Sequence, residues 1–432
     1  MRISKDFRIS YKNLIFIVLC VIVSSCLTDK NKMKTEKNLN ASEILGNPDF
    51  PAICYGGYRK ATREIELTKQ EIKEDVLILS ALGFKVLRTY NVHYTEAEYL
   101  LEVIRELKNE DPNFEMYLML GAWIDCKNAR TDSVNHFEES EKNEAEVKKA
   151  ALLAREFPDI VKIVAVGNEA MVQWATSYYV QPAVILQWVA YLQDLKKNGY
   201  LPENLWITSS DNFASWGGGG KEYHHEDLNK LIAAVDYISI HTYPMHDTHY
   251  NPAFWGVKNV ELELSDSMKI AKAMERSVDY AASQYQNVLR YVRNLGFDKP
   301  IHIGETGWAS HCNGFYGNNG SRAVDEYKSG TYYKSMLSWC QNNGLTCFYF
   351  EAFDEPWKDA NNPKGSENHF GLISVEGKVK YAIWDKLDAG LLKGLKRDGK
   401  SLSKTFGSEI ELLQHSLVPP ISIMPDTHYQ YR

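Results

Sequence analysis

From about residue 50 onward, short apolar runs alternate with longer amphipathic segments along the chain. The short runs are rich in β-branched and aromatic residues and almost continuously apolar, which is typical of strands buried on both faces. Eight runs of this kind are predicted strands: Ile53–Tyr58, Lys85–Tyr90, Glu115–Ala122, Val161–Asn168, Asn204–Ser210, Val235–His241, Lys299–Glu305 and Thr346–Phe353.

The longer segments carry the spacing of amphipathic helices. In Thr95–Lys108, leucine and isoleucine side chains recur on one face, and Gln181–Lys197 shows a similar pattern. Ser265–Leu295 is the longest such segment and accommodates one helix or two.

The alternation of strands and helices predicts the architecture. Strands that are each followed by a helix form a parallel sheet covered by helices. Eight such units over ~340 residues match a closed (β/α)8 TIM barrel, folded as a single domain over residues 51–395. An open doubly wound sheet is the alternative, but it would carry a glycine-rich turn after its first strand, and none is present. The run Trp216–Gly220 lacks the Lys-Ser/Thr of a phosphate-binding loop and is interpreted as a flexible barrel loop.

The amino terminus has the pattern of a targeting segment. Basic residues precede an apolar run, Leu14–Val23, which is too short to span a bilayer as a helix. The sequence Val23–Cys26 resembles a bacterial lipoprotein signal, so residues 1–25 are a predicted signal peptide and Cys26 a predicted lipidation site. Residues 26–50 are a predicted flexible tether. This implies an exported lipoprotein of the bacterial cell envelope, at the outer membrane or cell surface; the alternatives are an ordinary signal peptide or a single anchoring helix.

Residues 396–432 are weakly patterned and are treated as a C-terminal extension of unknown role, although Leu412 and Leu413 are candidates for docking on the barrel. If Cys20 leaves with the signal and Cys26 carries lipid, an odd number of cysteines remains: Cys54, Cys126, Cys312, Cys340 and Cys347. At least one thiol is then unpaired, and the pairing stays open. The cysteines show no CxxC spacing, so structural zinc is not expected.

Composition narrows the class of function. Apolar residues make up 44% and charged residues 24%, as in soluble proteins with a substantial core. The net charge of −7 argues against a nucleic-acid partner and against an anionic membrane, so we expect membrane contact only through the lipid. The 26 Tyr and 10 Trp suit a site that stacks on sugars. We expect a monomer without a cofactor.

Two carboxylates follow strands that end in apolar residues. Glu169 comes directly after the fourth predicted strand, and Glu305 ends the seventh. In a parallel barrel the carboxyl ends of the strands face the active site, so both side chains are expected at its mouth. Paired carboxylates without surrounding metal ligands are the groups that cleave a glycosidic bond.

Five short motifs resemble glycoside hydrolase family 17, the β-1,3-glucanases: Leu87–Tyr90, Val166–Glu169, Ile240–Pro244, Ile303–Ser310 and Phe350–Lys358. They occur in the family's order and at the matching strand ends. The resemblance implies a (β/α)8 barrel and a retaining mechanism, with Glu169 as the acid/base and Glu305 as the nucleophile.

Around these two carboxylates, several residues are expected to contact Glu305 or the substrate. Arg88 and Tyr243 resemble the residues beside the nucleophile and would hold the pKa of Glu305 down. Burial and the charge of Glu305 would raise the pKa of Glu169, and Asn168 would donate a hydrogen bond to the sugar 2-hydroxyl.

Further candidates for sugar binding are aromatic or acidic. Trp308 and Trp357 are expected as sugar platforms; Tyr55, Tyr90 and Trp123 are either platforms or core; and Glu351, Asp354 and Glu355 are expected to bind sugar hydroxyls, with a second catalytic pair as the alternative. His241, His246 and His249 with Asp247 lack a metal-site spacing and are interpreted as polar loop residues rather than ligands.

The function predicted from these residues is retaining hydrolysis of laminarin-like β-1,3-glucan, of endo type. A transglycosylase would use the same two acids, and β-1,6 or mixed linkages stay open. A non-catalytic glycan-binding lipoprotein is the alternative from another class, and it would have no need of both Glu169 and Glu305.

Overall fold

The computed structural model describes residues 39–248, 256–313 and 322–421. Parallel strands close into a barrel in the order β1-β2-β3-β6-β7-β8-β9-β10. The strands are β1 (Ala52–Cys54), β2 (Val86–Arg88), β3 (Tyr117–Ala122), β6 (Val161–Asn168), β7 (Trp206–Asn212), β8 (Ile238–His241), β9 (Ile301–Gly307) and β10 (Cys347–Phe350). Each predicted strand is present within a few residues of its expected ends, which confirms the (β/α)8 barrel.

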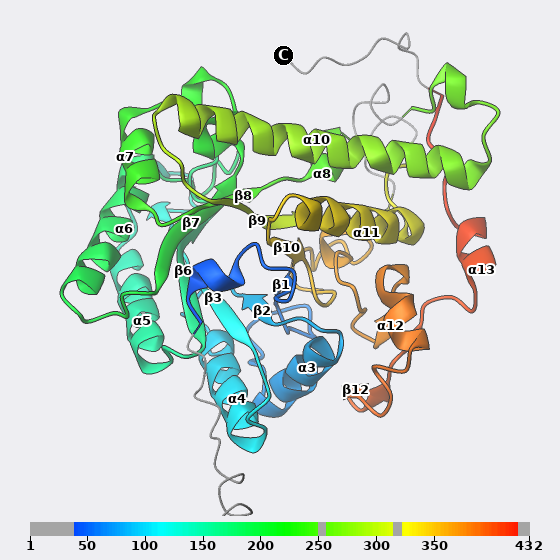
Figure 1. The fold of residues 1–432 in the computed structure, drawn as a ribbon, viewed down its shortest axis with the longest axis horizontal. Helices are drawn as coiled ribbons and strands as arrows, with labels where there is room; N and C mark the ends of the chain where they lie inside the picture. The colour runs from blue at the N-terminus through cyan, green and yellow to red at the C-terminus, as the bar shows by residue number, and fades with distance from the viewer. Residues whose placement is uncertain (1–38, 249–255, 314–321, 422–432) are drawn as a thin grey trace, which may run out of the picture. The chain divides into compact units, whose positions relative to one another are not determined.

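Helices cover the outside of the barrel (Figure 1). They are α3 (Lys69–Ala81), α4 (Glu96–Glu110), α5 (Asn143–Glu156), α6 (Pro182–Lys197), α7 (Glu226–Ala234), α10 (Asp266–Asn294) and α11 (Glu326–Asn342). The Ser265 hydroxyl caps α10 by accepting a hydrogen bond from the Met268 amide, and the helix then continues unbroken to Asn294. Ser265–Leu295, which was predicted to form one helix or two, therefore forms a single helix.

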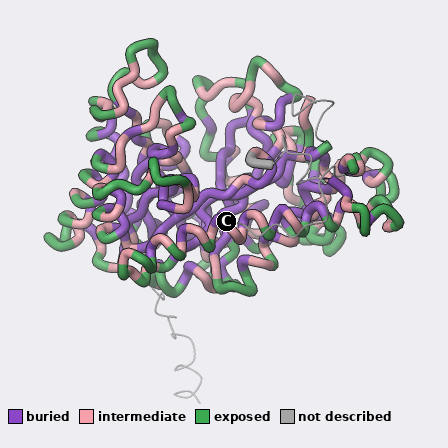
Figure 2. Tube along the Cα trace, turned by 90° about the horizontal axis from the view of Figure 1, so that it is seen from above, coloured by how far each residue is buried: buried purple, intermediate pink, exposed green. Residues whose placement is uncertain are grey.

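The barrel strands are almost entirely buried, while the outer faces of the helices are exposed (Figure 2). The register of the strands brings their carboxyl ends to one level. Asn168 of β6 pairs with Ser210 of β7, and His241 of β8 pairs with Glu305 of β9. Residues from four consecutive strands therefore meet at one mouth of the barrel.

The run Trp216–Gly220 packs against its neighbours, and its first part is a helical turn rather than the loop that was predicted. Residues Ala214–Gly218 form a helical turn in which the Trp216 indole is fully buried and donates a hydrogen bond to the Ser239 carbonyl at 3.0 Å. Gly217 has a φ of +84°, and a Cβ there would overlap the ring of Tyr291 on α10. Glycine is required here because of both the conformation and the close approach.

The compact body begins before the predicted domain boundary at residue 51. A short helix, α2 (Ala41–Ile44), follows Asn40, and Ile44, Leu45 and Phe50 are buried. Residues 40–50 are therefore part of the folded body rather than of a flexible tether. The predicted signal peptide, Cys26 and the first part of the tether lie outside the described residues.

The C-terminal extension is also integrated into the body. Its first hairpin is β12 (Lys396–Arg397) and β13 (Lys400–Ser401). Arg397 is fully buried, and its Nε donates to Asp75 of α3 at 2.9 Å. Farther along, Leu412 of α13 (Glu409–Gln414) is buried, and the buried Lys328 ammonium of α11 donates to the Leu417 carbonyl at 2.5 Å. No structural boundary therefore falls at residue 395.

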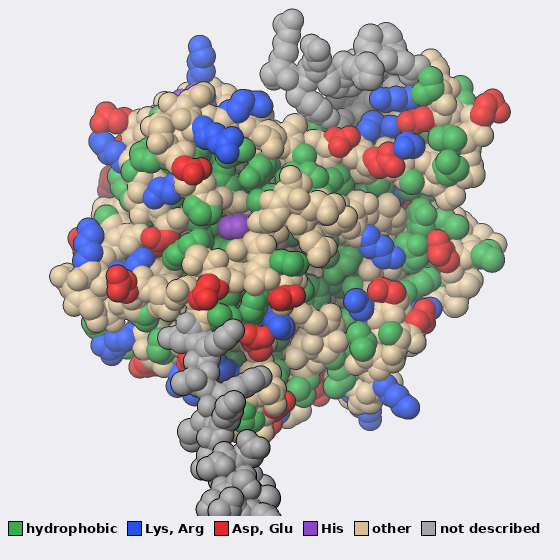
Figure 3. Space-filling view, in the orientation of Figure 1, with side chains coloured by type: hydrophobic (Ala, Val, Ile, Leu, Met, Phe, Trp, Pro, Cys, Tyr) green, Lys and Arg blue, Asp and Glu red, His purple; other side chains and the backbone are tan. Residues whose placement is uncertain are grey.

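The remaining short elements are β4 (Cys126–Lys127), β5 (Asn135–Glu139), α8 (Pro244–Thr248), β11 (Lys378–Val379), α12 (Trp384–Asp388) and β14 (Ser403–Lys404). Acidic and basic side chains are interspersed on the face shown in Figure 3. Among the described residues, no disulfide joins the cysteines, and no helix is long and apolar enough to cross a membrane.

Candidate active site

The two predicted carboxylates meet at one imidazole. Glu169 directly follows β6, and Glu305 lies near the end of β9. The ring of His241, which ends β8, lies 3.1 Å from Glu169 (Nδ1 to Oε1) and 3.8 Å from Glu305 (Nε2 to Oε2). The barrel register thus brings together two carboxyls that are 136 residues apart (305 − 169) in the chain.

The backbone at Glu169 adopts an uncommon conformation. Its φ is +47°, and Gly167 two residues earlier has a φ of +81°. A non-glycine residue in the left-handed region costs of order 1–3 kcal/mol and persists only where neighbouring contacts hold it, often at functional sites. This turn directs the Glu169 side chain toward His241.

Glu305 is held as a carboxylate. Burial alone would raise its pKa, but the potential of His241 and Arg88 and hydrogen bonds from Tyr243 and Arg88 outweigh burial and lower the pKa to about 2. The Tyr243 hydroxyl donates to Oε1 at 2.5 Å, and the Arg88 guanidinium forms a buried ion pair with Oε2.

His241 is neutral near pH 7, because burial lowers its pKa to about 4. Near pH 7 the ionised form of Glu305 is therefore held by Arg88 and Tyr243, and the imidazole adds positive charge only below a pH of about 4. Since Arg88 Nη2 lies 3.3 Å from Nε2 and can only donate, Nε2 accepts and Nδ1–H donates to Glu169. The interpretation of His241 as a polar loop residue is wrong. It is a fully buried strand residue.

Glu169 has the opposite electrostatic environment. Burial raises its pKa first, and the negative charge of Glu305 raises it further, to about 8. Glu169 is therefore protonated at neutral pH while Glu305 is ionised. One acid and one carboxylate in the same site are the pair that general acid catalysis with a nucleophile requires.

Arg88 does not lie open to a substrate, as a predicted substrate-binding residue would. Its side chain is buried, and its donors go to protein groups: Glu305, the Gly304 carbonyl at 3.0 Å and Asn168 Oδ1 at 2.5 Å. The Asn168 amide oxygen is thereby fixed, which leaves its NH2 group as the available donor. Arg88 orients both Glu305 and Asn168.

Two predicted sugar platforms are core residues. Trp308 is fully buried, with its indole N–H donating to the Ala323 carbonyl at 3.0 Å and its ring against Tyr332. Tyr55 is also fully buried, and its ring packs edge-on against Phe353. A ring without exposed surface cannot stack on a sugar, so the prediction is wrong for both.

The other aromatic candidates stay open. Trp357 is part-exposed, with its indole N–H on Glu355 at 2.8 Å and the Arg63 guanidinium 3.8 Å above its ring. Tyr90 is part-exposed beneath the Arg88 guanidinium, and Trp123 is part-exposed. These three rings retain surface for a ligand.

The acidic cluster after β10 divides into two parts. Asp354 pairs with Lys380 at 2.6 Å and accepts the Gly371 amide, so its carboxylate is used by the fold rather than by sugar hydroxyls. Glu351 and Glu355 flank the Lys358 ammonium at 3.8 and 3.3 Å. Burial raises the pKa of Glu351 well above its usual value. Glu351 and Glu355 remain candidates for hydroxyl binding.

Two further histidines were predicted as polar loop residues. His246 stacks on Tyr243, whereas His249 lies outside the described residues.

Asp211 was missed because the predicted strand ended at Ser210, whereas β7 continues to Asn212. The polar run from Ser209 to Asn212 was the available signal. Among the described residues, no group of His, Cys, Asp or Glu is arranged to hold a metal ion.

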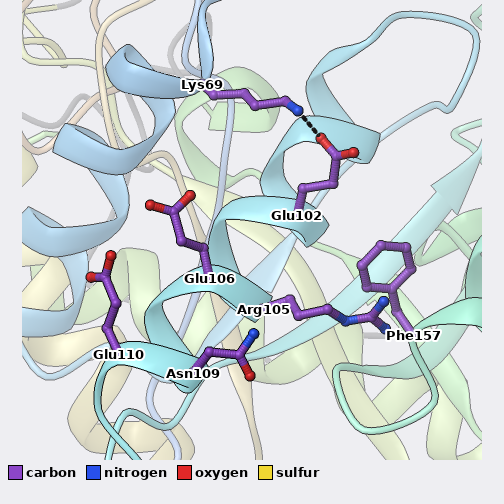
Figure 4. A pocket seen from close by; sticks show the side chains of 7 residues that line it. All are labelled: Lys69, Glu102, Arg105, Glu106, Asn109, Glu110 and Phe157. Carbon is purple, nitrogen blue, oxygen red and sulfur yellow. Dashed lines mark ion pairs between the residues drawn. The ribbon is translucent and has the colours of Figure 1, made fainter.

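Two surface hollows lie away from these residues. One lies between α3 and α4 and is lined by Lys69, Glu102, Arg105, Glu106, Asn109, Glu110 and Phe157 (Figure 4). Its charged side chains pair with neighbours, as Lys69 does with Glu102 at 2.6 Å. A second, more apolar cavity of about 470 Å³ lies at the amino ends of β1 and β10, opposite the carboxylates. Neither contains a candidate catalytic group.

Comparison with known families is decisive for the class of protein. Residues 52–371, most of the chain, match the family described as the BtgE/BtgC glycoside hydrolase domain. The chain belongs to this family. The match confirms the resemblance to the β-1,3-glucanases of glycoside hydrolase family 17.

Individual proteins that match the chain are named for activity on laminarin or β-1,3-glucan. An endo-laminarinase from Formosa Hel1_33_131 is 57% identical, with a TM-score of 0.88 over 90% of this chain and 100% of that chain. A probable glucan endo-1,3-beta-glucosidase btgC from Aspergillus terreus is 26% identical over 79% of this chain and 46% of its own length. The chain thus spans about half the length of such curated relatives. A β-1,3-glucanosyltransferase from Rhizomucor miehei, 18% identical over 77% of this chain and 96% of its own, with a TM-score of 0.51, shares the fold.

Proposed function

We propose that the protein is a retaining endo-β-1,3-glucanase that acts on laminarin-like glucan. The observation that carries the proposal is the pair Glu169 and Glu305, which share the His241 imidazole but have opposite pKa shifts. The Formosa relative, which matches along its whole length, is an endo-laminarinase and supports this substrate class.

In the first step, the Glu305 carboxylate attacks the anomeric carbon as the glycosidic C–O bond breaks. Glu169 gives its proton to the leaving oxygen, so the shortened glucan departs as a neutral alcohol. Arg88 and Tyr243 hold Glu305 ionised and oriented for this attack. The Asn168 NH2 group is the donor for the sugar 2-hydroxyl, a contact that strengthens in the transition state.

In the second step, Glu169 is a carboxylate and takes a proton from water, which attacks the glycosyl ester and releases Glu305. Hydrogen bonding from the His241 Nδ1–H supports this charged form of Glu169. A sugar hydroxyl in place of water would give transglycosylation, the alternative that the same residues permit. Product analysis on linear and branched laminarin measures the balance between the two.

Glu305→Ala and Glu169→Ala separate the two roles. Glu305→Ala removes the attacking group, so cleavage should fall by several orders of magnitude on every β-glucan. Glu169→Ala should still react with substrates that have a good leaving group, and added azide should restore turnover as a β-glycosyl azide. Glu102→Ala, at a part-exposed residue of α4 away from the site, is the control. Azide rescue of Glu305→Ala alone, as an α-azide, would show that the roles are reversed.

We also propose that the protein is anchored to the cell envelope through a lipid on Cys26, as a monomer. The support is the sequence: basic residues, a short apolar run and small residues before the cysteine. Cys26→Ala should release the protein from the membrane fraction or leave its precursor uncleaved, whereas Cys20→Ala should not. Unchanged processing and membrane retention of Cys26→Ala would refute lipidation at this residue.

A further inference from the structure

The turn that carries Glu169 is clamped by two consecutive residues of β7. The Glu169 amide donates to the Ser210 carbonyl at 3.0 Å. Two residues later, the Met171 amide donates to Asp211 Oδ2 at 2.7 Å. The first of these is a backbone contact that any residue at position 210 could make. The second depends on the side chain at position 211.

The Asp211 carboxylate is fully buried and fully used. Oδ2 binds the turn, and Oδ1 accepts the Asn212 amide at 2.7 Å. Because Glu169 has a positive φ, its conformation depends on such external contacts. Removing the acceptor would leave the Met171 amide without that bond and release one side of the turn.

Asp211 also lies within the electrostatic environment of Glu169. The titratable groups around it are Glu169 and Tyr178 from the segment after β6, His241 from β8, and Tyr223. Burial raises the pKa of Asp211 to about 7, the bond from Met171 opposes the rise, and the charge of Glu169 adds to it. The charge of Glu169 thus acts on a second buried carboxyl, which the bond from Met171 attaches to the same turn.

We propose that Asp211 is a positioning residue for Glu169: it fixes the turn that aims the acid/base, and its negative charge helps to keep that acid protonated. This inference rests on the proposed function. It assigns to Asp211 no contact with the substrate, and its effect should be confined to steps in which Glu169 moves a proton.

The test compares Asp211→Asn and Asp211→Ala in the whole protein. Asn keeps an oxygen acceptor for Met171, although not a second one for the Asn212 amide, and it removes the charge, so the alkaline limb of kcat/KM on glucan should move down by roughly half a pH unit or more. Ala removes both, and kcat on glucan should also fall at least tenfold. With a good-leaving-group substrate, formation of the glycosyl-enzyme needs no acid, and its rate should stay within about twofold of the wild type.

Asp236→Asn is the matched control. Asp236 accepts the Ile207 amide at 2.7 Å at the opposite end of β7, so its loss tests an equivalent bond far from Glu169. It should leave the pH profile unchanged. An unmoved alkaline limb in Asp211→Asn, or equal losses on good and poor leaving groups, would overturn the proposal. Absence of azide rescue in Glu169→Ala would instead refute the proposed function, whatever the Asp211 variants show.

Discussion

At the scale of single residues, two glutamates of the site differ in pKa because their surroundings differ. Glu169 and Glu305 are both buried glutamates, yet one has a raised and the other a lowered pKa. The difference comes from the donors, because Arg88 and Tyr243 donate to Glu305 and not to Glu169. The carboxylate nearest to fixed positive charge therefore ionises first, and its charge then keeps the other protonated.

Removing those donors should shift the acidic limb of activity. In the wild type, kcat/KM requires ionised Glu305 and should therefore rise as the pH passes its pKa of about 2. In Arg88→Met, burial of Glu305 is no longer opposed by the guanidinium, so its pKa rises and the acidic limb should move up by about 1–3 pH units. Tyr243→Phe should move it in the same direction by less. The measurement is the pH dependence of kcat/KM on a soluble glucan.

Tyr55→Phe is the control for these variants. Tyr55 is a buried tyrosine whose hydroxyl lies 3.4 Å from Asp75, away from both catalytic candidates. It should retain the wild-type acidic limb. If Arg88→Met and Tyr243→Phe also retained it, these donors would not set the ionisation of Glu305.

Residue types and strand ends in the sequence predicted Glu169 and Glu305 at the barrel mouth, and the family resemblance added their roles, Arg88 and Tyr243. What they could not give is the direction of each side chain. Trp308 directly follows the strand that carries Glu305, but its ring turns into the core. His241, in contrast, ends its strand facing the site. A motif gives residue order, whereas burial depends on packing from distant parts of the chain.

At the scale of secondary-structure elements, prediction succeeded where periodicity is strong. The strands are recognisable because burial on both faces demands unbroken apolar runs. The turn at Trp216 was misread because a glycine run in isolation indicates freedom. Here tertiary contacts with α10 and Ser239 determine its conformation, and these are not local in sequence.

Gly217→Ala tests whether this turn is rigid. The φ of +84° and the overlap with Tyr291 should together cost roughly 1–3 kcal/mol in the free energy of unfolding. Gly220→Ala is the matched control, because its φ is −70° and the added Cβ meets only the movable end of the Glu222 side chain. Chemical denaturation measures both. Equal stability of the two variants would mean that the turn is flexible after all.

At the scale of the whole folded body, the C-terminal extension is joined to α3 by a buried ion pair. Asp75 of α3 is fully buried and is neutralised by Arg397, from the C-terminal extension, and by Arg59 at 3.1 Å. The sequence gave no signal for this pairing, since the partners are 322 residues apart. A charged residue in a weakly patterned tail has the same local pattern whether it is solvated or buried.

Arg397→Met should therefore destabilise the protein strongly. Breaking a buried ion pair leaves a charge without its full compensation, at a cost of about 3–5 kcal/mol, and the lower end is expected because Arg59 remains. Lys400→Met, in the same hairpin, removes only an exposed pair with Asp398 and should change stability by less than about 1 kcal/mol. Urea unfolding of both variants tests this. A small effect of Arg397→Met would show that Arg59 alone neutralises Asp75.

A gene fragment that ends before the C-terminal extension would lack part of the folded body. A piece cut to the family match at residues 52–371 would encode both catalytic candidates and every barrel strand. It would lack Lys380, the partner of Asp354, and Arg397, the partner of Asp75, so two buried carboxylates would lose cations supplied by the missing segment. We therefore expect such a piece, expressed from environmental DNA, to be less stable than the whole chain, so that its low activity would reflect lost folding contacts rather than missing chemistry.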